Sequence, residues 1–317
     1  MARRFLLPLV ELLAVLFLVS IGVFMLLSLV PGDPAIAVLG EGREPHEYEA
    51  MREQLNLNDP LLSRYFDWLG GVLTLDFGTS LVPPQTSVLD RIMAALPVSL
   101  ELALLGLGMA LVIAIPLAMW SAYHEGGRAD RVISAVSFGL LSMPSFLIGL
   151  LLIAIVVNSL DLLPRNEWVR LGDGIGGNIQ HAILPALTIG LMEAAMFTRI
   201  LRNDLVTTLR EDYILAARAR GMSPVRVMVS DALRPSSFSL VTILGISIGR
   251  LVGSTVIVEY LFALPGMGKL VIEAANQGNY PVVQGAVLVI AVIYVVSNAL
   301  IDRTYGYLDP RTRRARA

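Results

Sequence analysis

Apolar residues occur along the chain in long runs that alternate with polar segments. A helix needs about 20 apolar residues to cross a membrane, and six runs approach or exceed that length: residues 5–30, 97–123, 131–159, 184–201, 238–258 and 282–301. The pattern therefore predicts an all-α membrane protein with six transmembrane helices. Pro116 and Pro144 lie inside the second and third runs, where proline favours a kink.

The polar segments divide the chain into four predicted regions. The first transmembrane helix covers residues 1–30, and we expect it to be retained because no small-residue cleavage site follows it. Residues 31–96 form a polar segment with expected helices at 46–55 and 61–72. The remaining five helices lie within 97–305, and residues 306–317 form a basic tail. Between the helices we expect a glycine-rich loop at 161–180 and a turn at 264–270.

Composition agrees with a membrane protein and excludes several functions. The 317 residues are 55% hydrophobic and 16% charged, with a mean hydropathy of +0.70, far outside the range of soluble domains. A net charge of −2 suggests no nucleic-acid partner, and the absence of cysteine excludes disulfides and thiolate metal sites. The segment LPGMGKL lacks the first glycine and the final Ser or Thr of a phosphate-binding loop. We expect no catalytic site, metal site or cofactor in this chain.

The basic residues indicate the orientation in the membrane. Seven of the 24 lysines and arginines fall on one side, and Arg250 lies inside a run. The other sixteen share a side with both termini and the polar stretch 204–235; they are residues 3, 4, 128, 131, 199, 202, 210, 218, 220, 226, 234, 303, 311, 313, 314 and 316. The positive-inside rule therefore predicts that both termini and this stretch are cytoplasmic.

The stretch 204–235, here called the elbow, has the clearest local signals. Its sequence predicts a short helix over 205–220, a stop at Gly221 and a second helix that begins at Pro224. Glycine adopts the left-handed conformation of a helix end at little cost. Ser223 is a good N-cap, and proline is tolerated at the first helical position.

Two interpretations of the elbow surface remain open from the residues alone. Small side chains at Ala216, Ala217 and Ala219 suit insertion into a partner's cleft, and the nearby arginines suit acidic groups on such a partner. Alternatively, the elbow is a solvated connector whose arginines only satisfy the topology rule.

Two opposite charges lie inside the predicted spans at similar depth. Glu193 is about ten residues from the outer end of the fourth span, and Arg250 about eight from that of the fifth, which corresponds to roughly 15 and 12 Å at 1.5 Å per residue. A charge near the middle of the bilayer is costly and usually faces protein or water. Three interpretations are open: the two residues form a structural ion pair, they line a water-filled substrate path, or their placements are unrelated.

The elbow residues resemble a known family. The sequence AARARG at 216–221, followed by Ala232, Leu233 and Arg234, is similar to the EAA loop of binding-protein-dependent ABC importer permeases. Almost the whole chain resembles the B-type permease of the dipeptide/oligopeptide/nickel group, through LVPGDPA (29–35), LNLNDPLLSRYFDWL (55–69), DFGTS (76–80), SMPSF (142–146), VEYLFALPGMGKL (258–270), NYPVVQG (279–285) and LDPR (308–311).

The resemblance implies an ABC importer type I permease fold and an importer subunit of a bacterial inner membrane. Its implied partners are the lipid bilayer, a homologous second permease, two cytoplasmic ATPase subunits that use ATP and Mg²⁺, and an extracytoplasmic solute-binding protein. The ATPase-docking residues would be Ala216, Ala217, Arg218, Ala219, Gly221, Ser223 and Pro224.

Two positions depart from the family pattern. Leu215 stands where the loop motif has glutamate, and Arg250 stands where relatives often have a small residue. Di- or oligopeptides are the expected substrates; nickel, glutathione or a glycoside are alternatives within the family. An ion-driven secondary transporter is the alternative from another class, but we find no inverted repeat of the kind it would need.

Overall fold

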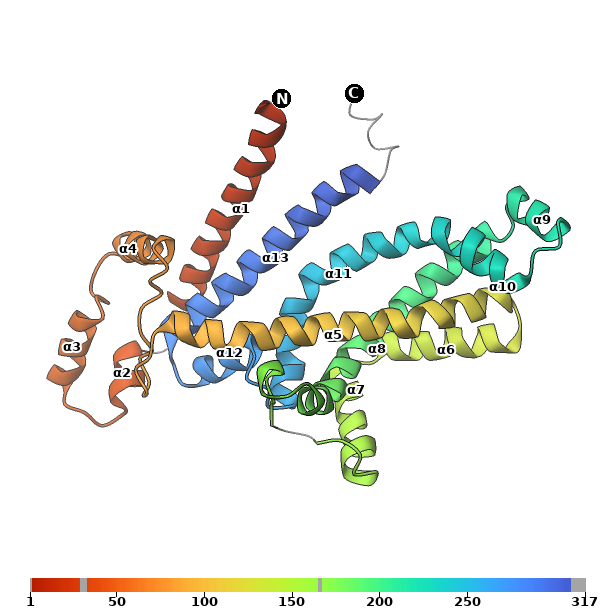
Figure 1. Ribbon diagram of the computed structural model, residues 1–317. Helices are drawn as coiled ribbons and strands as arrows, with labels where there is room; N and C mark the ends of the chain where they lie inside the picture. The colour runs from red at the N-terminus through yellow and green to blue at the C-terminus, as the bar shows by residue number, and fades with distance from the viewer. Residues whose placement is uncertain (1, 29–32, 165–166, 309–317) are drawn as a thin grey trace. The chain divides into compact units, whose positions relative to one another are not determined.

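The computed structural model describes residues 2–28, 33–164 and 167–308, and these are almost entirely helical (Figure 1). The only β-type pairing among them is an isolated bridge between Thr79 and Ser87. The helices are α1 (Ala2–Ser28), α2 (Pro34–Leu39), α3 (Pro45–Gln54), α4 (Leu61–Leu73), α5 (Val88–Tyr123), α6 (Arg128–Ser142), α7 (Ser145–Leu152), α8 (Ile175–Thr208), α9 (Asp212–Ala219), α10 (Pro224–Arg226), α11 (Leu233–Leu261), α12 (Met267–Asn276) and α13 (Tyr280–Leu308). Two π-helical turns, η1 (Ile153–Ser159) and η3 (Val227–Ala232), and the 3₁₀ turn η2 (Leu171–Asp173) complete the list.

The chain separates into two compact units. Unit 1 contains Met1–Ser99 and Pro265–Leu300, and unit 2 contains Leu100–Leu264 and Ile301–Ala317. The boundary falls within α5, so that residues 88–99 of this helix belong to unit 1 and residues 100–123 to unit 2.

Unit 1 is built around an apolar core between α12, α13 and the first turns of α5. Phe77, from the loop after α4, packs into this core with Val88, Ile92, Met267 and Val282. The Asn279 side chain fixes the same loop, because its amide donates to Ser80 Oγ at 2.8 Å and its oxygen accepts from the Leu81 N–H at 3.1 Å. The polar segment after α1 is thereby tied to the start of α13.

A second contact in unit 1 joins α1 to α4. The Tyr65 hydroxyl lies 2.8 Å from Ser20 Oγ, and the Tyr65 ring packs edge-on against Phe24 with 5.5 Å between centroids. Trp68, one turn further along α4, also contacts Phe24. The predicted helices at 46–55 and 61–72 are confirmed as α3 and α4, and the aromatic side of α4 is used to pack on α1.

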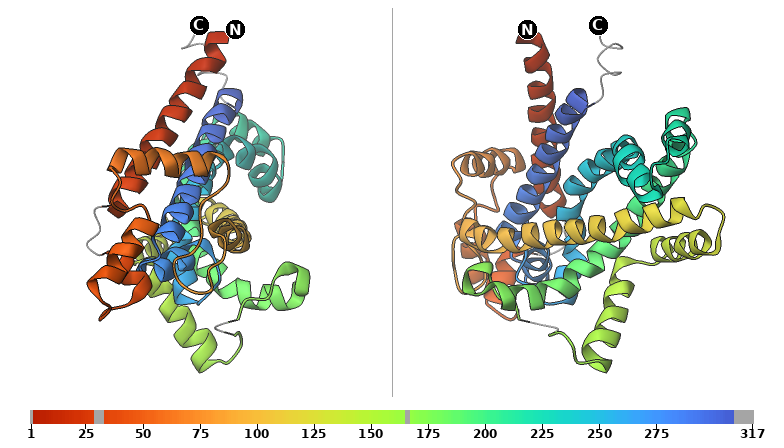
Figure 2. Two further views of the ribbon diagram at one scale, coloured as in Figure 1. Left: turned by 90° about the vertical axis from the view of Figure 1, so that its left-hand side faces the viewer. Right: turned by 45° about the vertical axis from the view of Figure 1, so that its right-hand side comes forward.

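Unit 2 is organised around α8, which packs against α6, α7 and α11. Figure 1 and the right view of Figure 2 show α6 running beside the C-terminal half of α5. Gly106 of α5 and Gly190 of α8 permit a close approach of these helices, since a Cβ atom on Gly190 would lie 2.8 Å from the Gly106 carbonyl oxygen. Small residues at such crossings are typical of helix packing in membranes.

The predicted number of spans is supported only in part. Within the described residues, α5, α8 and the Tyr280–Ile301 part of α13 are long and apolar enough to cross a membrane. The bent helix pair Arg128–Ser142 and Ser145–Ser159 adds a fourth if it is one span, and Val10–Met25 is a shorter apolar helix. An all-α membrane protein is therefore shown, whereas the count of six stays a prediction, as do the predicted region boundaries.

The third predicted span is not a single kinked helix. It divides into α6 and α7, which are bent by 108° relative to each other. Met143 has extended backbone angles of φ −96° and ψ 138°, because the ring of Pro144 disfavours a helical conformation in the residue before it. In contrast, α5 remains one helix across Pro116.

Three local predictions were wrong in extent. The loop expected at 161–180 ends at Gly174, because α8 begins at Ile175. The turn expected at 264–270 is shorter, since α12 begins at Met267. The single helix expected at 205–220 is instead the end of α8, a turn at 209–211, and the separate helix α9. In each case helix continuation is decided by packing that the local sequence does not reveal.

Candidate functional site

The elbow contains a helix stop centred on Gly221. This glycine has φ +78°, and its N–H donates to the Arg218 carbonyl at 2.9 Å while the Met222 N–H donates to the Ala217 carbonyl at 3.3 Å. This pair of hydrogen bonds is the Schellman motif, which satisfies the last carbonyls of a helix and favours glycine at the left-handed position. The predicted stop at Gly221 is therefore confirmed.

The second elbow helix also begins where the sequence predicts. Ser223 has extended backbone angles, its hydroxyl accepts from the Arg226 N–H at 3.4 Å, and Pro224 occupies the first helical position. This helix does not end within the elbow. It continues from α10 through η3 into α11, so a displacement of the elbow would act directly on a long helix of unit 2.

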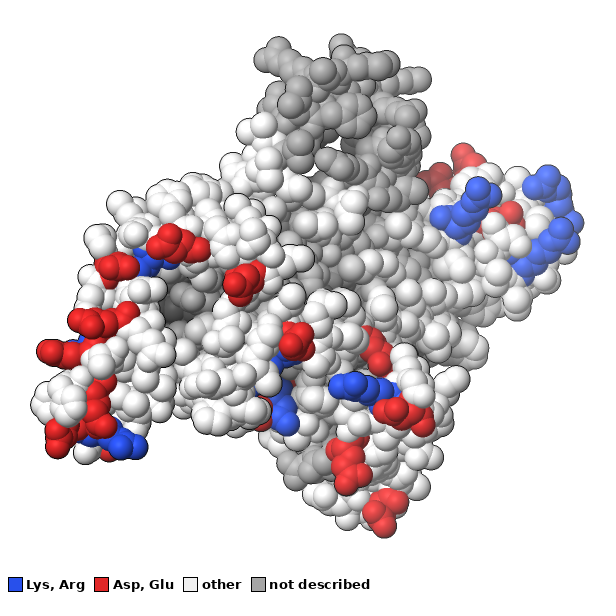
Figure 3. All heavy atoms as spheres, turned by 60° about the vertical axis from the view of Figure 1, so that its left-hand side comes forward, with Lys and Arg blue, Asp and Glu red and all other residues white. Residues whose placement is uncertain are grey.

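The predicted docking residues differ in exposure. Ala217 is buried, together with Ile214, Val227 and Met228, in a small core between α9 and η3. The others are exposed: Ala216, Arg218, Ala219, Gly221, Ser223 and Pro224. Figure 3 shows basic side chains gathered at this end of unit 2. Ala217 thus supports the elbow from within, while the other six lie on its surface.

Polar contacts hold the parts of the elbow together and link it to Ser236, which follows it directly. Ser236 Oγ donates to Thr208 Oγ1 at 2.9 Å, which links α11 to the end of α8. The Tyr213 hydroxyl donates to the Asp231 carbonyl at 3.4 Å. Partial desolvation of the Tyr213 hydroxyl and the nearby charges of Glu211 and Asp231 raise the pKa of this phenol, which is a donor at neutral pH in any case.

An ion pair connects the elbow to the turn between α5 and α6. Arg210 lies 2.8 Å from Glu125, and both side chains are solvent-exposed. An exposed pair of this kind contributes little to stability. It nevertheless brings the α5–α6 turn and the elbow into direct contact at the same end of unit 2.

Asp130 joins three helices near the elbow and was not identified from the sequence. Its buried carboxylate accepts hydrogen bonds from Ser121 Oγ at 2.6 Å and the Gly126 N–H at 2.9 Å. It also accepts from Arg202 Nε at 3.0 Å and from a second Arg202 nitrogen at 2.7 Å. The planar guanidinium favours this bidentate contact with a carboxylate. The only sequence signal is an acidic residue three positions after the Gly126–Gly127 turn.

Glu193 and Arg250 lie next to each other in unit 2. A terminal nitrogen of Arg250 is 2.5 Å from Glu193 Oε1, and Ser247 Oγ donates to Glu193 Oε2 at 2.8 Å. The Glu193 side chain is only 8% exposed, whereas that of Arg250 is 53% exposed in the isolated chain. The two residues therefore form an ion pair between α8 and α11; whether it also lines a substrate path stays a prediction.

Glu101, near the start of unit 2, accepts a 2.6 Å hydrogen bond from Asn178 and so has a structural partner. Among the described residues, no group of three or more His, Asp or Glu side chains is placed to hold a metal ion.

Comparisons with known proteins agree with the resemblance in the elbow. The family described as "Binding-protein-dependent transport system inner membrane component" matches residues 114–314, and its N-terminal counterpart matches residues 1–103. The oligopeptide transport system permease protein AppB of Bacillus subtilis is 36% identical over 290 residues, which cover 91% of this chain and 92% of AppB. The di/tripeptide transport system permease protein DppB of Pseudomonas aeruginosa is 33% identical and covers 95% of both chains.

A solved structure shares the fold. An inward-facing structure of the MetNI methionine ABC transporter superposes with a TM-score of 0.56 at 15% identity, covering 69% of this chain and 96% of that chain. A second crystal form gives a TM-score of 0.54. Since identity this low supports only the fold, the family assignment depends on the sequence matches. The chain therefore belongs to the family of binding-protein-dependent transport system inner membrane components, among the B-type permeases of the dipeptide/oligopeptide group.

Proposed function

We propose that this chain is a membrane permease subunit of an ATP-driven importer of di- or oligopeptides. The substrate class is supported by relatives that match over nearly their whole length and are named for oligopeptide, dipeptide and di/tripeptide transport. Nickel, glutathione and glycosides are less favoured for the same reason. The family consists of transport components, so we assign no catalytic step to this chain.

The elbow surface is the observation that carries the proposed coupling to an ATPase. Although this segment is polar, it exposes the large apolar side chains Leu215 (52%) and Val225 (73%) on either side of Gly221. Exposed apolar residues rimmed by charge are typical of protein interfaces, and Arg218, Arg220 and Arg226 provide such a rim. Leu215, which replaces the family's glutamate, would supply apolar contact where that charge is missing.

Coupling follows from the way the elbow is built. A partner that grips α9 and Gly221 acts on α10, η3 and α11 as one continuous stretch of helix. It also acts on the α5–α6 turn through Arg210 and Glu125. ATP-driven closure of two ATPase subunits would thereby bias the bundle between two states, as alternating access requires. A second permease would complete the pathway, and a solute-binding protein would deliver peptide from the opposite side.

The first test is co-purification of the tagged chain with the ATPase subunits expressed beside it. We expect the wild-type chain to retain them and Gly221→Leu to lose them, because a side chain at φ +78° is strained and would project from the docking surface. Gly42→Leu is a matched control, since Gly42 has φ +86° and equally open surroundings but lies outside the elbow.

Uptake in proteoliposomes completes the test. Import of tri-alanine should need the binding protein, the ATPase subunits and ATP, and Gly221→Leu should abolish it while the protein remains inserted. Import by the chain alone without ATP would instead support an ion-driven transporter. Equal loss of the ATPase subunits in both glycine variants would show that strain, rather than docking, caused the effect.

A further inference from the structure

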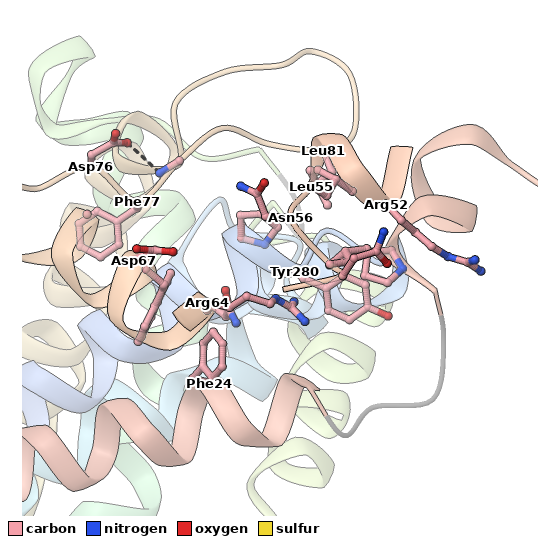
Figure 4. Close-up of a pocket in the computed structure, with 18 of the residues that line it drawn as sticks. Phe24, Arg52, Leu55, Asn56, Arg64, Asp67, Asp76, Phe77, Leu81 and Tyr280 are labelled. Carbon is pink, nitrogen blue, oxygen red and sulfur yellow. Dashed lines mark hydrogen bonds between the residues drawn. The ribbon is translucent and has the colours of Figure 1, made fainter. Parts of the chain in front are cut away.

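A large cavity lies in unit 1, outside the elbow and outside the Glu193–Arg250 pair. Its volume is about 800 Å³, which is within the range of small-molecule binding pockets. The lining comes from the end of α1, the segment with α2–α4, the loop after α4 and the start of α13 (Figure 4). The distribution of basic residues predicts that this part of the chain and the elbow lie on opposite sides of the membrane.

The cavity contains two opposite charges that are not used by the protein itself. Arg64 and Asp67 both line it, three residues apart on α4. Their spacing would allow a pair across one helical turn, yet among the described residues neither side chain has a hydrogen-bond or ion-pair partner. Figure 4 shows Arg64 reaching into the cavity between Phe24 and Tyr280.

The other charges of the lining already have partners. Arg52 forms an ion pair with Asp33, and its Nε donates to Asp33 Oδ2 at 2.8 Å. Asp76 Oδ1 accepts from the Gly78 N–H at 2.9 Å. Arg64 and Asp67 are therefore the charged groups available to a ligand, one of each sign.

The walls beside these charges are aromatic and rigid. Phe24 and Trp68 pack with 5.7 Å between ring centroids, and Phe77 is anchored in the core of unit 1. Tyr280 and the amide side chains of Asn56 and Gln284 complete the surface. Rigid apolar walls with a few convergent polar groups are what a ligand pocket needs.

We propose that this cavity receives a short peptide with free termini, whose α-carboxylate pairs with Arg64 and whose ammonium group pairs with Asp67. A peptide carries both charges at once, which matches the two unpaired groups on one helix. A segment of a partner protein would offer apolar and singly charged side chains, which this pair of opposite charges suits less well. The inference rests on the proposed peptide-import function, because it assigns the peptide a place to bind on this chain.

The test measures binding of tritiated tri-alanine to the purified permease–ATPase complex in nanodiscs, without the binding protein. The same measurement is made with tri-alanine amide, which lacks the carboxylate, and with N-acetyl-tri-alanine, which lacks the ammonium group. The variants are Arg64→Gln and Asp67→Asn. Arg43→Gln is the matched control, because Arg43 is an exposed arginine of the same segment that does not line the cavity.

We expect wild type to bind tri-alanine about tenfold or more tightly than its amide, as a charge-assisted hydrogen bond would give. In Arg64→Gln this ratio should fall to about one, while Arg43→Gln keeps it. Asp67→Asn should likewise remove the preference over the N-acetyl peptide without changing the preference over the amide. Such ligand-specific losses would not arise from general unfolding.

Three outcomes would overturn the inference. If wild type imports tri-alanine with its binding protein but the acid-to-amide ratio is unchanged in Arg64→Gln, or if the complex alone binds no peptide, the cavity does not hold the peptide. If Arg64→Gln instead weakens capture of the binding protein, the cavity is a docking site for that protein. Failure of wild type to import any peptide would be a different result, since it would reject the proposed function.

Discussion

The contribution of a charged residue to the stability of this permease depends on how deeply the residue is buried. Asp130 is the clearest case. Its side chain is 8% exposed, and its carboxylate accepts hydrogen bonds from Ser121, the Gly126 N–H and two nitrogens of Arg202. The pair Arg210–Glu125 lies near it but is open to water. Similar ion pairs thus have different energetic weight in one small region.

Removal of the Arg202 guanidinium, which pairs with Asp130, should strongly destabilise the protein. We expect Arg202→Met to lower the free energy of unfolding by about 3 kcal/mol, the lower end of the cost of leaving a buried charge unpaired. Glu125→Gln is the control and should change it by less than about 1 kcal/mol. Thermal unfolding of the purified chain in detergent measures both; equal shifts in the two variants would contradict the role assigned to Asp130.

Asp33 gives the segment after α1 a defined dependence on pH. Burial alone would raise the pKa of its carboxyl group, but the hydrogen bonds from Arg52 and the Ala35 N–H, with the Arg52 charge, lower it below the usual value. A lowered folded-state pKa means that the carboxylate stabilises this segment above the ordinary aspartate pKa of about 3.9. This contribution is lost as the pH falls below that value through the folded-state pKa.

Hydrogen exchange of residues 34–54 tests this dependence. At each pH, the exchange rate of Asp33→Asn is divided by that of wild type, so that the intrinsic pH dependence of exchange cancels. We expect a ratio above one at pH 6 that begins to fall below about pH 4 and approaches one only when the pH is below the lowered folded-state pKa of Asp33. The exposed residue Glu53, changed to Gln, should give a ratio near one throughout. A constant ratio for Asp33→Asn would reject the interpretation.

At the scale of elements, close helix crossings decide what unit 2 can tolerate. Gly106 and Gly190 let α5 and α8 approach, and Glu193 and Arg250 join α8 to α11 three residues further along α8. The central helix is therefore held on one side by backbone proximity and on another by an ion pair. Replacement of small residues at the crossing has consequences that exposed glycines on the same helices do not share.

Substitution of Gly190 tests the crossing. We expect Gly190→Ala to destabilise the protein by about 1–3 kcal/mol, since its Cβ atom would lie 2.8 Å from the Gly106 carbonyl oxygen and overpacking has this cost. Gly108→Ala is the control, because nothing lies within 4 Å of its added Cβ and alanine favours a helix. Thermal unfolding that showed the same change for both would contradict the proposed contact.

At the scale of the whole molecule, the functions proposed for the elbow and for the unit 1 cavity require the two to face opposite sides of the membrane. The charge distribution predicts that residues 33–87 and the elbow lie on opposite sides of the membrane. The chain has no cysteine, so labelling of a single introduced cysteine shows which side of the membrane that position faces. Ser63 on α4 and Ser230 in the elbow are both exposed and suit this experiment.

Labelling with a membrane-impermeant maleimide gives a direct answer. We expect Ser63→Cys to react in intact spheroplasts and Ser230→Cys to react only after the membrane is opened. The reverse pattern would invert the predicted topology, and labelling of both in intact spheroplasts would show that the two segments share one side.

The sequence alone determined features that depend on neighbouring residues. Apolar runs of membrane-spanning length predicted the all-α membrane class, and Gly221, Ser223 and Pro224 predicted the stop and restart in the elbow. These succeed because helix formation, capping and left-handed backbone are set within a few residues. The depth of Glu193 and Arg250 within their runs likewise showed that they could meet.

Only the tertiary structure decided the features that join distant parts of the chain. Asp130 and Arg202 are 72 residues apart, and the unit 1 cavity combines residues from Phe24 to Gln284. The burial of Ala217 and the true start of α8 also follow from packing between elements. Local sequence cannot fix them, because the same residues would be stable in several conformations until distant side chains select one of them.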